Sequence, residues 1–445
     1  MADLRTFLAG PQEQGDVVRI GDKVSARFEA AAILKNFQNR IIFLDNVDGF
    51  KAPLVAGVCG TRQRLNRALN TTWEGFYDRL GKALIQPRSP AEVDDGPVLE
   101  CIEGPHLQSL PILTHYERDA GPYITAGAVY ARVDDTAENV SIHRLQVIDD
   151  NHLAIRIVPR HLYRLCQIAR EKGLRTLDIS VSIGLHPVVM LAASSPVRAG
   201  VSHFDVANEL LEGGLELVKC PHVDAYAPKD AELVLEGRIL LDKNVPEGPF
   251  TDLTGTYDIQ RQQPLVEVVG VMHRHDYIYQ ALLPAGPEHR LLMGMPQEVR
   301  VWEYIRNVLP TAKAVNMTLG GCGWLHCVVS VEKFRDGDGK NVLLAVFAAN
   351  PSIKHAVVVD SDIDVYDMNQ VEWAISTRFR GDRGLLVVPN VRVSSLDPTA
   401  DQDLELGCKT GIDATRPFSK PREKFEPARI PQSMAVTSLL ERLKA

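Results

Sequence analysis

Two carboxylates, Glu247 and Asp252, stand five positions apart in a segment whose composition excludes a helix. Pro249 has no backbone N–H and Gly248 loosens the chain, so residues 246–255 predict a tight loop between two strands. Catalytic side chains are often carried by loops that a rigid scaffold holds. Paired carboxyl groups on one loop can take different pKa values, one acting as an acid while the other stays ionised. The alternative is a surface turn with two solvated acids.

A second segment, residues 138–147, also has residue types that could take part in catalysis or binding. Its pattern predicts a strand that carries polar side chains among apolar ones. Arg144 lies between Ile142 and Leu145, so its guanidinium is expected to be partly buried. A buried guanidinium needs an anion, which is either a structural carboxylate or a ligand. Asn139 and Arg144 would face opposite sides of a straight strand. If both serve one site, a bulge or bend has to lie between them.

Composition and charge exclude several classes of function. The chain has 445 residues, 45% of them hydrophobic and 24% charged, which is typical of a globular protein with two or three domains. Its net charge of −8 argues against a nucleic-acid partner. No apolar run is long enough for a transmembrane helix, and the N-terminus lacks the pattern of a signal peptide. Seven scattered cysteines suit reduced thiols, so we expect a cytoplasmic protein without a membrane partner.

The order of helical and strand patterns predicts an α/β portion, a strand-rich barrel or sandwich, a connector helix and a second α/β domain. Proline favours the first turn of a helix, so Pro296 is expected to begin the connector. The amphipathic C-terminal segment is expected to stay ordered only if it docks. The predicted parts, in chain order, are residues 1–105, 106–295, 296–310, 311–430 and the terminal helix 431–445.

Neither a GxGxxG nor a GxxxxGK[ST] motif is present, so a nucleotide-like cofactor would need a less regular site. The order and spacing of the polar segments, taken together, resemble the UbiD-like family of decarboxylases that use prenylated FMN. This resemblance covers about residues 20–430. It is carried by Asn139, Arg144, the helix that begins at His161, and residues 193–195, 216–220, 235–237, 246–250, 286–290 and 409–415.

The resemblance implies an N-terminal α/β portion, a central split β-barrel of the flavin-reductase-like type, the connector helix and a C-terminal α/β oligomerisation domain. It also implies reversible, non-oxidative decarboxylation of a small aromatic or heteroaromatic acid through a covalent adduct with prenylated FMN. Residues 286–290 look similar to branches that act on furan- and pyrrole-carboxylates. A homodimer or homohexamer is implied, with a flavin prenyltransferase as supplier of the cofactor.

The chemistry makes its own demands on these residues. Loss of CO2 from an sp2 carbon leaves a carbanion that no side chain stabilises well, so a cofactor has to act as electron sink. Arg144 matches the family's catalytic arginine and would orient the substrate carboxylate. Glu247 would pair with Arg144 and relay protons, and Asp252 would donate the proton. His289 and Arg290 would line the substrate pocket, or else serve the structure alone.

A divalent metal, with Mn2+ favoured by the resemblance, would anchor the cofactor phosphate. Asn139 and His161 match two of its ligands. His203 stands where the family usually has glutamate, which removes a hard oxygen ligand and weakens Mn2+ binding. Asp205 is the alternative third ligand, and K+ is expected at residues 193–195. The cofactor-binding positions implied by the resemblance are Asn139, Ser141, Ile142, His143, Arg144, Arg160, His161, Ser194 and, at the phosphate, Lys409.

Two other functions fit the same residues. A flavin-dependent oxidoreductase on a split barrel would need a site for a hydride donor, and no dinucleotide motif is visible. A cofactor-free subunit of a larger carboxylase complex is the other alternative, because His203 departs from the family's metal ligand.

Overall fold

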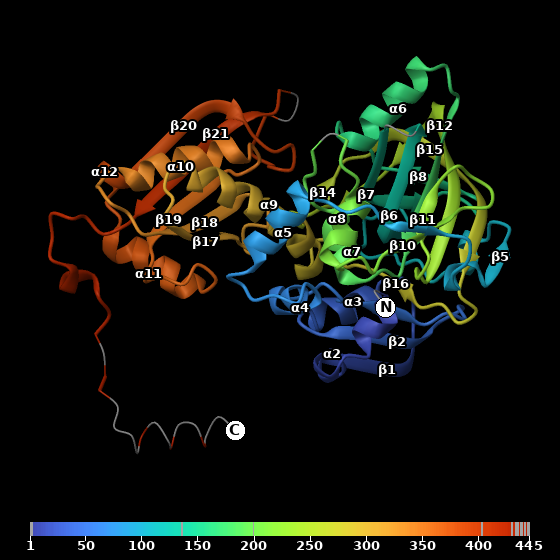
Figure 1. Cartoon of the computed structure of the whole chain (residues 1–445), viewed down its shortest axis with the longest axis horizontal. Helices are drawn as coiled ribbons and strands as arrows, with labels where there is room; N and C mark the ends of the chain where they lie inside the picture. Colours follow the sequence, from blue (N-terminus) through green and yellow to red (C-terminus); the bar gives the residue numbers. More distant parts are fainter. Residues whose placement is uncertain are drawn as a thin grey trace.

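The computed structural model describes residues 3–134, 137–198, 200–401, 404–428, 430, 431, 436, 439 and 442. An N-terminal α/β portion lies beneath a central β-barrel, and an α/β domain flanks the barrel on the other side of helix α9 (Figure 1). The predicted fold class is therefore confirmed. The predicted terminal helix, residues 431–445, falls almost wholly outside the described residues. Within the part that is described, no helix is long and apolar enough to cross a membrane.

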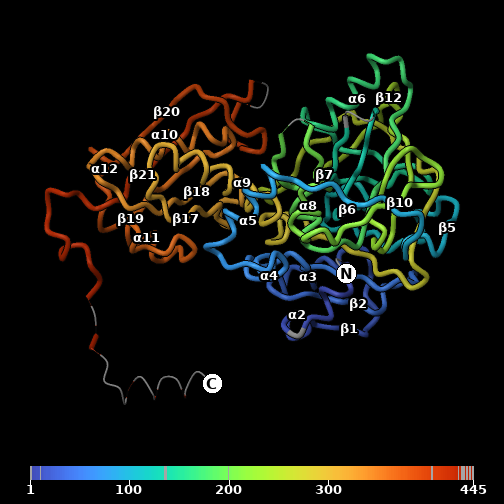
Figure 2. The backbone as a smooth tube through the Cα atoms, viewed as in Figure 1, coloured from blue at the N-terminus to red at the C-terminus, as the bar shows by residue number. Residues whose placement is uncertain are grey.

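The N-terminal portion is a small sheet with helices, and its tube lies against the lower edge of the barrel (Figure 2). Its four-stranded sheet has the order β1-β2-β3-β16, so one strand comes from a distant part of the chain. The elements are α1 (Leu4–Leu8), α2 (Pro11–Asp16), β1 (Val17–Val24), α3 (Glu29–Asn36), β2 (Ile41–Val47), β3 (Leu54–Ala56), α4 (Arg62–Ala68), α5 (Phe76–Ile85), β4 (Ala91–Val93), η1 (Pro97–Leu99), β5 (Cys101–Glu103), η2 (Leu107–Ser109) and β16 (Tyr279–Gln280).

Six antiparallel strands close the barrel in the order β12-β9-β6-β7-β8-β15, because β12 also pairs with β15. Strand β5 pairs with β15 outside this ring. Alternating apolar side chains fill the interior, among them Ile179, Val181 and Leu235. The elements are β6 (Tyr123–Asp134), β7 (Ala137–Val147), β8 (His152–Ile155), α6 (His161–Glu171), β9 (Thr176–Ile183), α7 (Pro187–Ala193), α8 (His203–Leu210), β10 (Glu216–Lys219), β11 (Tyr226–Pro228), β12 (Leu233–Glu247), β13 (Phe250–Thr251), β14 (Tyr257–Asp258) and β15 (Arg261–His273).

Helix α9 (Pro287–Arg306) connects the barrel to the C-terminal domain, and the prediction that it begins at Pro296 is wrong. Both Gly286-Pro287 and Pro296 could start a helix, and the earlier pair does. Gly286 is the extended N-cap residue, and Pro287 occupies the first turn, where a missing N–H costs nothing. Pro296 lies buried inside the helix. Its lost hydrogen bond is tolerated because the same segment buries core side chains such as Met295 and Val299.

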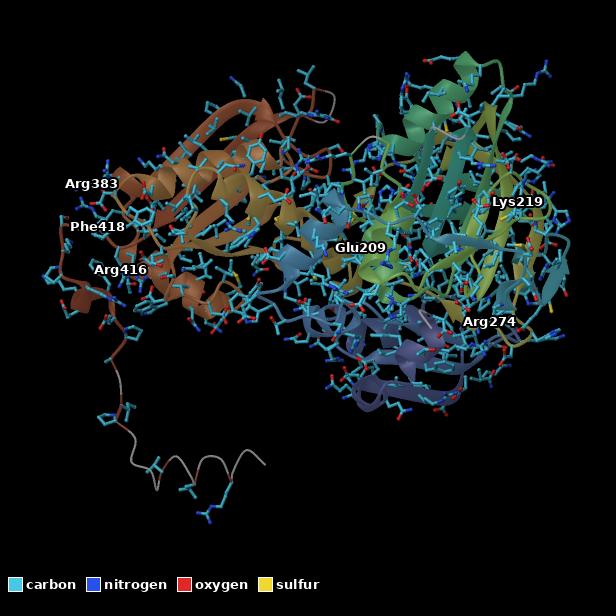
Figure 3. All side chains as sticks on the ribbon, in the orientation of Figure 1. Glu209, Lys219, Arg274, Arg383, Arg416 and Phe418 are labelled. Carbon is cyan, nitrogen blue, oxygen red and sulfur yellow. The ribbon has the colours of Figure 1, made fainter. Side chains whose placement is uncertain are left out.

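The C-terminal domain is a five-stranded sheet of order β17-β18-β19-β21-β20 covered by helices. Arg378, buried on α11, donates to Asp360 at the end of β19 and to Asp362 just beyond it, so Asp360 and Arg378 form a buried ion pair while Asp362 stays partly exposed. Figure 3 labels Arg416 and Phe418 where the chain leaves the domain. The elements are β17 (Ala312–Met317), β18 (His326–Val331), α10 (Asp338–Ala349), β19 (His355–Asp360), α11 (Met368–Arg378), α12 (Gly381–Gly384), β20 (Leu385–Arg392), β21 (Leu406–Ala414) and η3 (Arg422–Phe425).

One buried ion pair joins all three parts of the molecule. Arg62 on α4 donates two parallel hydrogen bonds, of 2.7 and 2.5 Å, to the fully buried carboxylate of Glu298 on α9. The same carboxylate accepts the backbone N–H of Met317 on β17 at 2.8 Å. Nearby, the ring of Tyr77 on α5 stacks on Trp302 of α9 with 4.4 Å between centroids. The N-terminal helices therefore help to set the position of the C-terminal domain.

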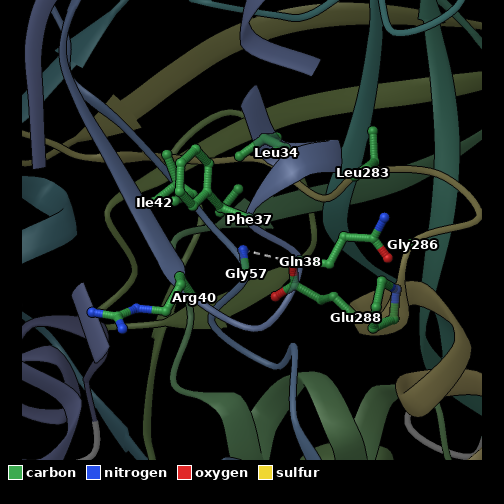
Figure 4. A pocket seen from close by; sticks show the side chains of 11 residues that line it. Leu34, Phe37, Gln38, Arg40, Ile42, Gly57, Leu283, Gly286 and Glu288 are labelled. Atoms are coloured by element: carbon green, nitrogen blue, oxygen red, sulfur yellow. Dashed lines mark hydrogen bonds between the residues drawn. The ribbon is translucent and has the colours of Figure 1, made fainter. Parts of the chain in front are cut away.

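A second buried carboxyl group holds the N-terminal sheet against the start of α9. Glu288 accepts the backbone N–H groups of Gly57 and Cys59 at 2.8 and 2.7 Å, and it lines a small pocket with Leu34 and Ile42 (Figure 4). Burial raises the pKa of Glu288 to about 7, and the two backbone donors only partly oppose that rise.

We expect this carboxyl group to make stability depend on pH. The folded-state pKa of about 7 lies above the ordinary value of 4.5, so the folded chain holds this proton more tightly than the unfolded chain does. The stabilisation is complete below pH 4.5 and is lost as the pH rises toward 7. Between pH 5 and pH 8 the wild type should lose roughly 2–3 kcal/mol of unfolding free energy more than Glu288→Gln does. Urea unfolding at both pH values measures this, with the exposed Glu74→Gln as control, and equal losses in wild type and Glu288→Gln would contradict it.

Candidate active site

Arg144, on β7, binds three carboxylates at once. Its Nε and Nη2 donate to the two oxygens of Glu247 at 2.9 and 3.0 Å, which is a bidentate pair. Nη1 donates to Asp252 at 2.8 Å, and Nη2 also donates to Asp258 at 2.9 Å. Within the described residues, four of the five N–H donors of the guanidinium are thus used, which leaves one on Nη1. The sequence analysis predicted that a buried Arg144 needs an anion, and in the structure a cluster of three carboxylates fills that role.

The acidic loop is held by its own backbone and by the barrel. Strand β12 ends at Glu247, and the short strands β13 and β14 follow, so the predicted loop is a strand end and a small hairpin. Gly248, with φ of +89°, donates its N–H to the side chain of Gln146, a neighbour of Arg144 on β7. Beyond it, Asp252 accepts the N–H of Leu253 on its Oδ1. The carboxylate is therefore fixed by its turn as well as by Arg144.

Burial separates the roles that the three acids can play. Side-chain exposure is 0% for Glu247, 12% for Asp258 and 23% for Asp252, and it is 9% for Arg144. Burial by itself would lower the pKa of Arg144, but the ion pairs outweigh it and raise that pKa above the ordinary value. Burial would raise the pKa of Asp258, and Arg144 together with Arg261 outweighs it, so that pKa is lowered. Asp252 is the acid that solvent and a ligand can reach.

Asp258 is a site residue that the sequence analysis missed. It contacts Arg144, and its other oxygen accepts from Arg261 at 3.2 Å. The Arg156 guanidinium lies 3.7 Å from it. The spacing of Asp258 and Arg261 was the one signal in the sequence, and an acid three positions before an arginine is too common to indicate a site.

His289 and Arg290 lie beside the acidic loop, in the first turn of α9. The Nδ1 of His289 accepts the N–H of Ala285 at 3.2 Å, so the proton of the neutral ring is on Nε2. Burial lowers the pKa of His289, although nearby Asp252 acts to raise it. Arg290 donates to the carbonyl groups of Leu253 in the loop and Leu319 in the C-terminal domain. This turn therefore brings two nitrogen donors next to the acid that solvent reaches.

The residues predicted to bind metal form a second group on the barrel. The Oδ1 of Asn139 is buried and has no hydrogen-bond partner among the described residues. Its Nδ2 donates to Ser141 at 2.7 Å, so the amide is oriented and its oxygen is left for a cation. The rings of His161, which begins α6, and His203, which begins α8, lie 6.2 Å apart between centroids. The unsatisfied buried oxygen of Asn139 fits a metal ligand, and the ring of His161 lies near that of His203 on the same side of the barrel.

The third predicted ligand is already engaged. The Nδ1 of His203 accepts the backbone N–H of Val140 at 3.4 Å, and the ring also bonds to the backbone of Ser195. Burial lowers the pKa of His203 to about 3, so the imidazole is neutral. It would have to exchange the long contact with Val140 for a metal ion. Asp205 bonds to the side chain of Ser89, so its carboxylate is turned to another partner.

Four further residues that were predicted to bind the cofactor lie near these groups, three on strand β7 and one at the end of α7. On the face of β7 that carries Asn139, the Ser141 hydroxyl donates to His143 Nε2 at 2.8 Å, since His143 Nδ1 donates to the carbonyl of Arg156. Ile142, on the other face, packs against the core. Ser194 caps α7 and donates its hydroxyl hydrogen to Met190, which leaves its oxygen lone pairs available.

The remaining two positions involve the C-terminal domain. The Arg160 guanidinium, at the end of the barrel, lies 5.6 Å from the ring centroid of Trp324 in that domain. Lys409 is on β21, where its amine donates to the carbonyl groups of Pro351 and Ile353. In the described structure these contacts hold Lys409 within its own domain, and burial lowers its pKa to about 8.

Arg156 connects the Arg144 cluster to the group of residues around Asn139. Its carbonyl accepts from His143, its N–H donates to the carbonyl of Arg144 at 3.2 Å, and its side chain approaches Asp258. The register of β6 against β7 also shifts between Ile124 and Gly127, opposite Arg144. The irregularity expected near Arg144 therefore lies in the partner strand. Together the groups present an oriented guanidinium, a partly exposed carboxyl group and a buried amide oxygen that has no hydrogen-bond partner among the described residues.

Three family models match the chain in order. They are described as the N-terminal domain (residues 11–84), the Rift-related domain (91–287) and the C-terminal domain (290–414) of 3-octaprenyl-4-hydroxybenzoate carboxy-lyase, UbiD. An anhydromevalonate phosphate decarboxylase of Methanothermobacter thermautotrophicus is 45% identical over 95% of this chain and 99% of its own. One of Methanosarcina mazei is 42% identical over 96% and 99%.

Solved structures of related enzymes superimpose on nearly the whole chain. The UbiD-class enzyme HmfF from Pelotomaculum thermopropionicum in complex with FMN superimposes with a TM-score of 0.94 at 39% identity, covering 96% of this chain and 97% of its own. An evolved dimeric form of the same enzyme in complex with prFMN has a TM-score of 0.90 at 36% identity, with 98% and 100% covered. Since the family models together span most of the chain and its relatives align nearly from end to end, the protein belongs to the UbiD family of carboxy-lyases.

Proposed function

We propose that the chain decarboxylates an unsaturated carboxylic acid, without net oxidation, with prenylated FMN as its cofactor. The observation that carries this proposal is the Arg144 cluster, in which a buried cation keeps one free N–H donor next to Asp252. Membership in a carboxy-lyase family and the relation to an enzyme solved with prFMN support it. Prenylated FMN, when bound, supplies the electron sink that side chains lack.

Each residue of the cluster then has a task. The remaining Nη1 donor of Arg144 binds and orients the substrate carboxylate, because a charged donor in a water-poor site favours that anion. Asp252, the most exposed of the three acids, takes up a proton from solvent and delivers it to the carbon that loses CO2. Glu247 and Asp258 keep the guanidinium charged and in place.

The cofactor is proposed to lie between the cluster and the Asn139 group. Asn139 and His161 would hold a divalent metal at the cofactor phosphate, with His203 completing the site once it releases Val140. A donor set of two imidazoles and one amide oxygen suits Zn2+, Fe2+ or Co2+ better than Mg2+, and Mn2+ stays the prediction from the resemblance. Proposed cofactor contacts from the chain are Ser141, Ile142, His143, Arg160, Ser194 and Lys409, with K+ at residues 193–195.

The first candidate substrate is anhydromevalonate phosphate. Five relatives that are 38–45% identical to the chain are named anhydromevalonate phosphate decarboxylase. The second candidate is the small heteroaromatic acid, of the furan- or pyrrole-carboxylate type, that was predicted from residues 286–290. His289 and Arg290 beside Asp252 favour a polar substrate of either kind, since both present nitrogen donors there.

The decisive experiment compares the two substrates on one holoenzyme. The chain is co-expressed with a flavin prenyltransferase, and CO2 release is measured from anhydromevalonate phosphate, furan-2-carboxylate and pyrrole-2-carboxylate. We expect release only when the prenylated flavin is present, with the phosphorylated acid preferred. Reduction of a flavin by NADH without release of CO2 would support the oxidoreductase alternative. A purified chain that never retains flavin or metal would support the cofactor-free subunit. A homodimer or homohexamer in the cytoplasm stays a prediction.

Arg144→Lys tests the cation of the cluster. Lysine keeps the charge but cannot make the bidentate bond to Glu247 or hold three carboxylates in one plane. We expect kcat/KM for CO2 release to fall by at least about 100-fold while the chain stays folded and binds flavin. Arg19→Lys, in an exposed ion pair with Asp45, is the control. A loss of less than about threefold would remove Arg144 from the mechanism.

Asp252→Asn tests the proton donor against its buried neighbour Glu247. Asparagine keeps the size of the side chain but delivers no acidic proton, so kcat should fall on the order of 100-fold or more. Incorporation of solvent deuterium into the product should slow by the same factor, and the urea midpoint should barely move. Glu247→Gln should instead lower the urea midpoint, because it leaves Arg144 poorly paired. Unchanged deuterium incorporation in Asp252→Asn would show that another group donates the proton.

A further inference from the structure

A cluster of imidazoles and a carboxylate lies at the outer edge of the barrel, away from the Arg144 cluster. Strand β5, which carries Glu103, is on the side of the barrel opposite the C-terminal domain (Figure 1). His273, at the end of β15, is directly opposite Cys101 of β5, and Glu103 is two positions further along the same face. His106 follows in the turn after β5. Segments distant in the sequence thus bring three potential metal ligands together.

The hydrogen bonds of the two imidazoles determine which nitrogen faces the carboxylate. His106 Nδ1 lies 2.7 Å from the carbonyl oxygen of Gly104, and His273 Nδ1 lies 2.7 Å from that of Arg274. A carbonyl oxygen can only accept, so both Nδ1 atoms carry the hydrogen. In the neutral rings both Nε2 atoms therefore present a lone pair. Metal-binding histidines are oriented in the same way, by an N–H bond to a backbone carbonyl or a carboxylate.

Both Nε2 atoms lie near the same carboxylate oxygen. Glu103 Oε2 lies 3.5 Å from His106 Nε2 and 3.7 Å from His273 Nε2, and all three atoms are within 4.8 Å of one another. These separations are too long for a charge-assisted hydrogen bond, which measures about 2.8 Å. Two ligands of a tetrahedral Zn2+ at about 2.0–2.1 Å lie roughly 3.4 Å apart. The two separations from Glu103 Oε2 are close to that value, so a cation between the three acceptor atoms would give them a common partner.

The donor set and the exposure select the class of cation. Two imidazole nitrogens and one carboxylate oxygen suit Zn2+ or Co2+, whereas Ca2+ and Mg2+ prefer oxygen ligands alone. Side-chain exposure rises from 9% at His273 to 28% at His106 and 54% at Glu103, so an ion can enter from solvent. Arg274, labelled at this edge in Figure 3, is turned toward Asp230 and Ala231 instead. Its guanidinium also lies 3.7–3.9 Å from the carboxylates of Asp3, Asp230 and Glu232, which balance its charge.

We propose that Glu103, His106 and His273 bind a Zn2+-like divalent cation, with water in the fourth position. The ion links the turn after β5 to the end of β15. Strand β5 pairs with the barrel over only three residues, so this link stabilises the segment that leads from the N-terminal portion into the barrel. The site is separate from Asn139, His161 and His203, and its occupation does not depend on the proposed reaction.

The test uses full-length protein in which His161→Ala and His203→Ala remove the other candidate metal site. This parent chain, freed of metal, is titrated with Co2+ and with Zn2+. We expect one Co2+ per chain, with the visible absorption of a tetrahedral ion and little sulfur charge transfer. Adding His106→Ala or Glu103→Gln should weaken binding by on the order of 100-fold or more. Both side chains are partly exposed, so neither substitution should prevent folding.

His152→Ala is the matched control, because this imidazole is as partly exposed as that of His106 and also contacts a carboxylate, that of Asp149 at 2.9 Å. It should leave Co2+ affinity unchanged. Zn2+ should also raise the thermal midpoint of the parent and of His152→Ala, but not that of Glu103→Gln. Equal Co2+ affinity in the parent and in His106→Ala, or no binding by the parent at micromolar Co2+, would overturn the proposal.

Discussion

A guanidinium buried among three carboxylates is the interaction on which the proposed active site depends. An isolated charge in this position would be costly, so Arg144 can stay on the barrel wall only while Glu247 and its fellow acids face it. The same bonds hold the strand end and hairpin that follow Glu247. Asp252 is therefore presented to solvent at a fixed distance from a fixed cation. One set of contacts therefore both holds the loop in place and positions Asp252 next to Arg144.

Helix α9 carries this arrangement across the molecule. Its first turn places His289 and Arg290 beside the acidic loop, and Arg290 also bonds to the C-terminal domain. Further along, Glu298 ties the helix to Arg62 of the N-terminal portion and to the C-terminal sheet. A shift of α9 would therefore displace residues beside the proposed active site and residues at the domain junction together. The helix continues through Pro296 because core packing outweighs one missing hydrogen bond.

Much of the fold could be predicted because its signals are local. Alternating apolar positions indicate the strands of a barrel or sandwich, and the stripe after His161 indicates a helix. Within the site, an arginine among apolar residues and two acids on a proline-glycine loop made Arg144, Glu247 and Asp252 candidates, and only the family resemblance gave them catalytic roles. The start of α9 was not predictable, since two prolines could each begin a helix and only tertiary packing separates them. Asp258 was missed because its role comes from contacts with residues far away in the chain.

The sequence by itself determined the order of the domains and the residue types that the chemistry requires, because these depend on local pattern and composition. Tertiary structure alone decided which acid is buried and which is reachable, since exposure depends on how β12, β14 and α9 pack around Arg144. It also decided that His203 bonds to Val140 and that Lys409 bonds within its own domain. Local sequence does not predict a hydrogen bond between distant segments, because the fold determines which residues lie close enough to bond.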